Sequence, residues 1–159
     1  MPSPTTEAPS RVGVEPGERD LLVEEIDRIA SSFTGAGTRE RYARLREAVA
    51  AGAVEGELVG HLEDLLEIFL ESRSVHHFHG PGPERSLLEL YRRTPRGAAV
   101  EEAAATANRA LEAVRGQAVE ALTFRPGLPG SHRLVVETDR CRLTLEIGRS
   151  GVTARDVSV

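Results

Sequence analysis

The sequence predicts an α+β protein in which an N-terminal bundle of about five helices precedes a small antiparallel β-meander of three to four strands. The main observation is a change of hydrophobic period near Gly116. Before this glycine, apolar residues recur at helical spacing, as in Val100, Ala104, Ala107, Leu111 and Val114. After it they alternate, as in Cys141, Leu143, Leu145 and Ile147. Alternation is typical of a strand with one buried face, whereas three- and four-residue spacing is typical of an amphipathic helix.

Length and composition support a single domain. The chain has 159 residues, of which 40% are hydrophobic and only 4% aromatic. This is enough apolar material for a core, and because tryptophan is absent, the core must consist mainly of leucine, valine, isoleucine and alanine.

Three segments are expected along the chain. Residues 1–16 are rich in proline, serine, threonine and glutamate, a composition that buries too little apolar surface to fold, so we expect a flexible tail. Residues 17–116 form the helical region. Residues 117–159 form the meander, which packs on the helices.

Glycines and prolines divide the helical region. Helices are expected to begin near residues 17, 38, 57, 83 and 98. The first is stopped by Gly35 and the next ends in the glycine-containing segment 50–56. The third reaches Arg73, the fourth ends before Pro95, and the last ends at Gly116, which is a natural C-terminal cap.

Strands are expected over residues 119–125, 132–138, 141–147 and 152–158. A tight turn at residues 138–140 joins the middle pair, and a turn at 148–151 leads to the last strand. Because the strands follow one another closely, sequential antiparallel pairing is the simplest topology. One face is apolar and the other polar, so we expect a sheet with one face on the helices.

Charge and composition argue against two classes of partner. The net charge is −5 and neither half of the chain has a strong excess of arginine, so a nucleic-acid footprint is not expected. No apolar run approaches the ~20 residues of a membrane span. A lone cysteine and an N-terminus without the features of a signal peptide indicate the cytoplasm. The use of arginine without lysine is typical of a GC-rich bacterial genome.

The segment from Ser74 to Gly80 carries the main candidate chemistry. His76 and His79 share a face if the segment is helical, and His77 and His79 share one if it is extended. Either pair could ligate zinc, nickel or iron, with further ligands supplied by folding or by a second subunit. The alternative is a polar helix end whose histidines interact with carbonyl groups or line an interface.

Other candidates have simpler structural interpretations. Cys141 lies on the apolar face of its strand and is expected to behave as a small hydrophobic residue. Adjacent acidic residues such as Glu24 and Glu25 point about 100° apart on a helix, so we expect solvated faces rather than an acid–base pair. No nucleotide-binding, nucleophile-elbow or zinc-protease motif is present.

We therefore expect a non-enzymatic accessory or interaction subunit of a larger cytoplasmic bacterial complex or of a homo-oligomer, without a cofactor. Phe78 is a candidate anchor residue, and Val157 and Val159 mark an unpaired C-terminal strand edge to which a partner strand could add. The alternative is a metal-handling protein that uses His76, His77 and His79. A third option is a small-molecule enzyme with a pocket between the helices and the sheet.

Overall fold

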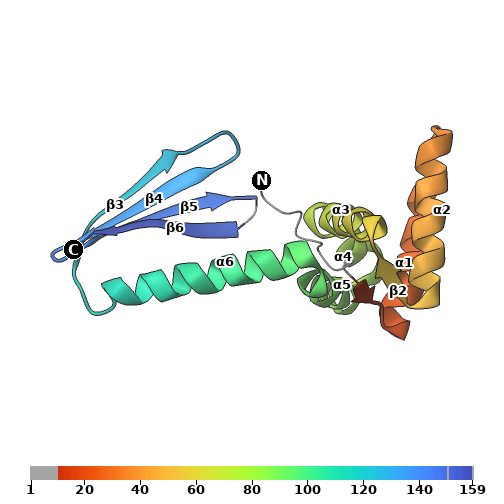
Figure 1. Ribbon diagram of the computed structural model, residues 1–159, viewed down its shortest axis with the longest axis horizontal. Helices are drawn as coiled ribbons and strands as arrows, with labels where there is room; N and C mark the ends of the chain where they lie inside the picture. The colour runs from red at the N-terminus through yellow and green to blue at the C-terminus, as the bar shows by residue number, and fades with distance from the viewer. Residues whose placement is uncertain (1–10, 150, 159) are drawn as a thin grey trace, which may run out of the picture. The chain divides into compact units, whose positions relative to one another are not determined.

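The computed structural model describes residues 11–149 and 151–158. The described chain contains six α-helices followed by a four-stranded antiparallel sheet, which confirms the predicted α+β class (Figure 1). It divides into two compact units, one up to Pro95 and the other from Arg96 onward. The last helix therefore groups with the strands, although its hydrophobic period resembles that of the preceding helices.

The first unit is mainly helical. Its helices are α1 (Pro16–Ala30), α2 (Ala36–Ala51), α3 (Glu57–Ser72), α4 (Ser74–His79) and α5 (Pro81–Arg93). Helix α1 starts with a capping box in which Glu15 and Glu18 satisfy each other's backbone N–H groups, and Pro16 supplies a preset backbone angle. Helix α2 ends at Gly52, whose φ of 88° is accessible mainly to glycine.

Residues 11–13 correct part of the predicted flexible tail. Strand β1 (Arg11–Gly13) pairs antiparallel with β2 (Ala53–Glu55), and Val12 lies opposite Val54. Both valines are buried, as is Val14, so burial of alternate apolar side chains compensates for ordering this short segment. Residues 1–10 of the predicted tail lie outside the described part of the chain.

The histidine segment forms a short helix of its own, α4, which was not predicted as a separate element. Arg73 adopts a left-handed conformation with φ of 52°, and this ends α3. Gly80, with φ of 84°, then separates α4 from α5. The backbone at these two residues explains why six helices form where about five were expected.

A continuous apolar core fills the first unit. Among the described residues, α1, α2, α3 and α5 contribute most of it, and the two short strands, α4 and Val14 add the remainder. The largest fully buried apolar side chains of this core are Phe69, Leu22, Ile26, Leu45, Leu62, Leu65, Leu66, Leu87 and Leu90.

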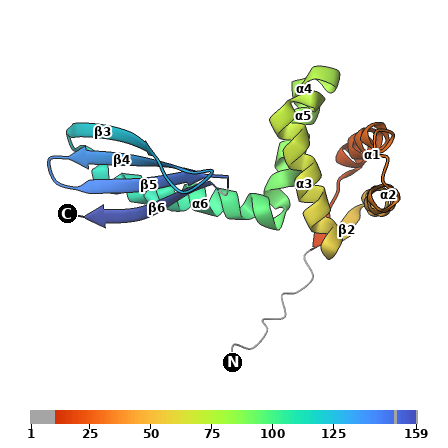
Figure 2. The ribbon, with the colours of Figure 1, turned by 90° about the horizontal axis from the view of Figure 1, so that it is seen from above.

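The second unit is one helix beside a four-stranded sheet. Helix α6 (Pro95–Leu111) and a short 3₁₀ turn (Glu112–Val114) precede β3 (Val119–Pro126), β4 (His132–Thr138), β5 (Arg142–Gly148) and β6 (Gly151–Ser158). The strand order is β3-β4-β5-β6 with every pair antiparallel, as predicted (Figure 2).

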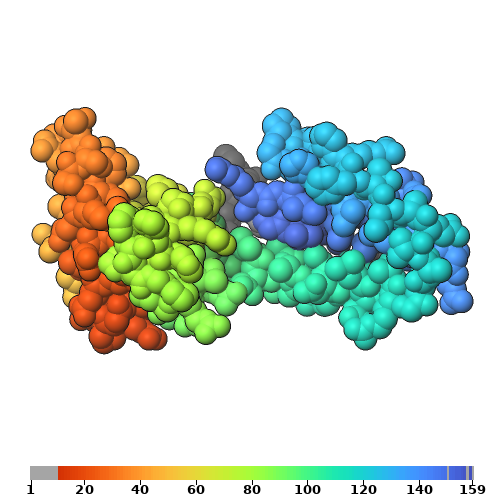
Figure 3. Space-filling view, turned by 180° about the vertical axis from the view of Figure 1, so that it is seen from behind, coloured from red at the N-terminus to blue at the C-terminus, as the bar shows by residue number. Residues whose placement is uncertain are grey.

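Small side chains let α6 pack closely on the sheet. Ala107 and Ala110 contact an apolar cluster that includes Val136, Leu143 and Leu145. At the start of β6, a Cβ on Gly151 would lie 3.3 Å from the Cβ of Ala103, so the strand approaches the helix almost as closely as two backbones permit. In the space-filling view the blue strands rest on the green-to-teal helix (Figure 3).

The described helices are all too short or too polar to cross a lipid bilayer.

Candidate functional site

Helix α6 leaves one strand of the sheet bare on the face that it otherwise covers. Leu122 of β3 is opposite Val136 of β4, and Phe124 is opposite Leu134, so these side chains share the face on which α6 packs. Val136 is buried at 6% exposure, but Leu122 is 65% exposed and Phe124 61%. The helix therefore shields the apolar side chains of the later strands and does not reach those of β3.

Two further apolar side chains extend this bare surface. Val119, at the start of β3, is 54% exposed, and Leu128, in the turn after β3, is 64% exposed. We call the set Val119, Leu122, Phe124 and Leu128 the β3 strip. It contains half of the large apolar side chains that are exposed in the described part of the chain. Such clustering of exposed apolar residues is typical of a binding surface.

The aromatic ring of the strip is held in a defined orientation. Phe124 stacks on His132 of the neighbouring strand, with ring centroids 5.2 Å apart and planes inclined by 12°. An oriented, exposed ring loses little side-chain entropy on association, which favours Phe124 as a contact residue.

Strand β3 is also an edge of the sheet. It pairs only with β4 among the described strands, so alternate backbone N–H and C=O groups face outward and can pair with another strand. A bulge lies between Val119 and Ala121, and Pro126 ends the strand. The stretch from Ala121 to Arg125 between them is regular.

The opposite edge, β6, has more of the features that discourage pairing. Its register shifts between Ala154 and Asp156, which leaves Arg155 in a bulge in the middle of the strand. Both Arg155 and Asp156 are exposed, and Arg155 Nε donates a hydrogen bond to Glu146 Oε2 at 2.7 Å. Bulges and charged residues protect an edge strand from other chains.

The predicted C-terminal contact was placed on this β6 edge. The side chain of Val157 and the whole of Val159 lie outside the described residues, so their part in a contact stays a prediction.

The three histidines of α4 do not converge. His76 Nδ1 lies 2.7 Å from Glu84 Oε2, and His79 Nε2 lies 3.0 Å from Glu25 Oε1. His77 instead packs edge-on against the ring of Phe78, with centroids 5.2 Å apart. Across residues 11–149 and 151–158 there is no group of three or more histidine, cysteine or acidic side chains that could hold a metal ion. The metal-binding interpretation therefore gains no ligand set from the described residues.

Glu25 is buried, which corrects the expectation of a solvated acidic face. Burial raises the pKa of this carboxyl, but hydrogen bonds from Arg28 and His79 together outweigh burial and leave the pKa below its ordinary value. Glu25 is thus a buried carboxylate that joins α1 to α4. The sequence pattern did not reveal this role, because His79 is 54 residues away in the chain.

Phe78 lies at the surface of the first unit, 61% exposed. The Arg28 guanidinium carbon is 5.0 Å from the centroid of its ring, a cation–π distance. The ring is therefore accessible but is already in contact with a cation of its own chain.

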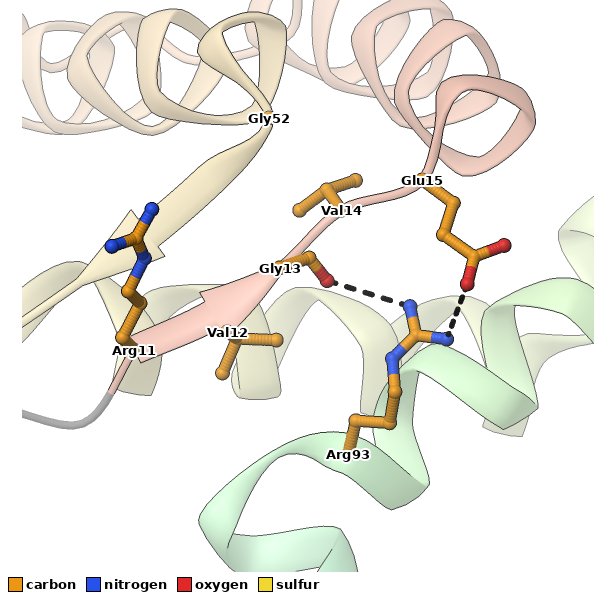
Figure 4. Close-up of a pocket in the computed structure, with 7 residues that line it drawn as sticks. All are labelled: Arg11, Val12, Gly13, Val14, Glu15, Gly52 and Arg93. Atoms are coloured by element: carbon orange, nitrogen blue, oxygen red, sulfur yellow. Dashed lines mark hydrogen bonds and ion pairs between the residues drawn. The ribbon is translucent and has the colours of Figure 1, made fainter.

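A hollow of about 420 Å³ in the first unit lies beside β1 (Figure 4). Arg93 spans one side of it, 3.6 Å from a Glu15 carboxylate oxygen and 3.4 Å from the Gly13 carbonyl oxygen. The same guanidinium is 2.5 Å from the buried carboxylate of Glu18, and Arg11 pairs with Glu55 at 3.2 Å. Both arginines in the hollow are therefore engaged within the chain and serve to attach β1 to its neighbours.

Cys141 is buried in the turn between β4 and β5. Its sulfur lies 3.4 Å from the hydroxyl of Thr138 and 3.5 Å from the side-chain oxygen of Gln117. These neighbours include no base, so the geometry suits a structural thiol rather than a nucleophile.

No protein-family model, curated protein or solved structure matches this chain. The β3 strip, which combines exposed apolar side chains with a free strand edge, is the feature that sequence reasoning missed. The alternation of Leu122 and Phe124 was visible, but their exposure depends on where α6 lies.

Proposed function

We propose that this chain is a non-enzymatic interaction protein, an accessory subunit of a cytoplasmic bacterial assembly or of a homo-oligomer, that associates through the β3 strip. The observation that carries the proposal is the exposure of Leu122 and Phe124, 65% and 61%, on the same sheet face that is otherwise packed beneath α6.

The energetics favour association at this surface. Full burial of a large apolar side chain contributes roughly 1.5–3 kcal/mol, and the strip offers four such side chains, each more than half exposed. A partner strand at the β3 edge adds main-chain hydrogen bonds to this apolar contact. Side-chain burial gives affinity, and backbone pairing gives the strand its direction and register.

The test compares three forms of the chain, each added at ~100 μM to a lysate of the cells that express it natively, so that a micromolar association is also populated. The first is wild type and the second is Leu122→Ser with Phe124→Ser. The third is a control, Ile68→Ser with Phe78→Ser, which removes two apolar side chains of the first unit that are 55% and 61% exposed. Gel filtration with immunodetection measures the apparent mass of each form.

We expect wild type and the control to elute above the 17.2 kDa of a single chain, and the strip variant to elute at that mass. Circular dichroism checks that both variants retain their fold. Monomeric elution of wild type, or an equal shift in both double variants, contradicts the proposal.

A further inference from the structure

We propose that the β3 strip receives the same strand of a second copy, so that two four-stranded sheets join edge to edge into one eight-stranded antiparallel sheet. This inference rests on the proposed function and adds the identity of the partner.

The symmetry of such a junction restricts its register. A two-fold axis perpendicular to the sheet makes the two β3 strands antiparallel and keeps both α6 helices on the same side. Residues that are directly opposite across the junction must then share a face. This condition allows only registers in which one residue of β3 is directly opposite the same residue of the second copy. That residue is described below as lying on the axis.

Placing Thr123 on the axis matches the apolar residues to one another. Leu122 of each copy is then opposite Phe124 of the other, and the junction contains two aromatic–aliphatic pairs. Such cross-strand pairs contribute roughly 0.2–1 kcal/mol each beyond an alanine pair. A shift that places Leu122 on the axis instead puts Phe124 opposite the Glu120 bulge, so the Thr123 register is the one that pairs all four large side chains.

The charges of β3 are compatible with self-pairing in this register. Arg125 is opposite Ala121 of the second copy, and Glu120 lies in the bulge at the far end of the regular stretch. Like charges therefore do not lie directly opposite each other at these positions. Pairing β6 with itself instead brings the bulge at Arg155 and the neighbouring Asp156 into the junction, which disfavours an edge contact there.

The available area sets the expected strength. Taking about 200 Å² for a large side chain, the β3 strip exposes on the order of 500 Å² of apolar surface per copy. Together with the paired backbone this places the junction at or below the lower end of specific interfaces, near 1,200 Å² in total. We therefore expect a reversible dimer with a dissociation constant on the order of 10 μM.

Cysteine crosslinking tests the register. Directly opposite residues of antiparallel strands have Cα atoms about 4.5–5.5 Å apart, within the range that a disulfide spans. Thr123→Cys is therefore expected to form a covalent dimer under mild oxidation, read on a non-reducing gel. The native Cys141 is only 8% exposed, and wild type treated in parallel gives its background.

Two controls match this variant. Thr144 lies on the same sheet face as Thr123, because both are aligned with Val135, but it is on an interior strand. Thr153 lies on the opposite edge, in β6. We expect Thr144→Cys and Thr153→Cys to remain monomeric on the gel. Crosslinking of Thr153→Cys without crosslinking of Thr123→Cys overturns the proposal.

Sedimentation velocity of the purified chain supplies the second measurement. We expect wild type to be mainly dimeric at ~100 μM and mainly monomeric at ~1 μM, and the Leu122→Ser, Phe124→Ser variant to be monomeric throughout. A wild-type monomer at ~100 μM overturns the self-pairing. If the same monomeric chain still elutes as a strip-dependent larger species in lysate, self-pairing fails while the proposed function stands.

Discussion

The two compact units handle their apolar side chains differently. Within the described residues, the first unit encloses fifteen buried apolar residues in one cluster, whereas the cluster between α6 and the sheet contains four. Phe69 of the first unit is 2% exposed, and Phe124 of the second is 61% exposed. The same type of side chain thus serves as core in one unit and as surface in the other.

The difference arises from how many elements cover each apolar face. In the first unit, several helices and a two-stranded sheet surround the apolar side of α3. In the second, a single helix about 10–12 Å across lies on four strands spaced about 4.8 Å apart. One helix is narrower than such a sheet, so an outer strand is left bare. An incomplete layer of this kind is what a binding partner completes.

The largest expected effect contrasts the two phenylalanines. Phe69→Ala should lower the unfolding free energy by about 3–5 kcal/mol, because it leaves a cavity in a packed core. Phe124→Ala should lower it by less than about 1 kcal/mol, because the ring is mostly in solvent. Urea denaturation at ~1 μM, where association contributes little, measures both. Equal losses of unfolding free energy from the two substitutions would contradict the assignment of Phe69 to the core and Phe124 to the surface.

A smaller effect is expected at the buried carboxylate of the first unit. Glu25→Gln should cost about 2 kcal/mol at pH 7, because it removes charge-assisted hydrogen bonds with Arg28 and His79. Glu24→Gln on the same helix, at an exposed position, should change stability by less than about 0.5 kcal/mol.

The cost at Glu25 should also depend on pH. Its pKa is lower in the folded chain than its ordinary value, so its contribution is present above an unfolded pKa of about 4.3 and is lost as the pH falls through the folded value. The gap between wild type and Glu25→Gln should therefore narrow below pH ~4 in urea titrations. A gap that widens on acidification contradicts the assignment.

The smallest effect is expected at the β6 edge. Arg155→Val removes a charge from its bulge and should raise concentration-dependent association by no more than a few-fold, because the bulge itself still interrupts pairing. Sedimentation velocity beside wild type measures the change. An increase in dimer affinity well beyond a few-fold over wild type would place the pairing edge at β6 rather than β3.

Much of the fold follows from local sequence patterns. The expected strands differ from the observed ones by at most one residue at each end, because turns at residues 138–140 and 148–151 separate clearly alternating segments. The helix starts predicted near residues 57 and 83 are also close to the observed starts at Glu57 and Pro81, because glycine and proline mark helix boundaries there. Strand β1 was missed because three residues around Gly13 are too few to establish a period.

The sequence by itself determined the order of helices and strands, the sequential antiparallel pairing, and which residues of each strand share a face. These properties depend on neighbours in the chain, through hydrophobic period and turn chemistry. Only the tertiary structure decided that Glu25 is buried against His79, that the three histidines separate, and that Leu122 and Phe124 stay exposed. Burial depends on which elements meet in space. The hydrophobic period of a single segment does not tell how many of the four strands one helix can cover.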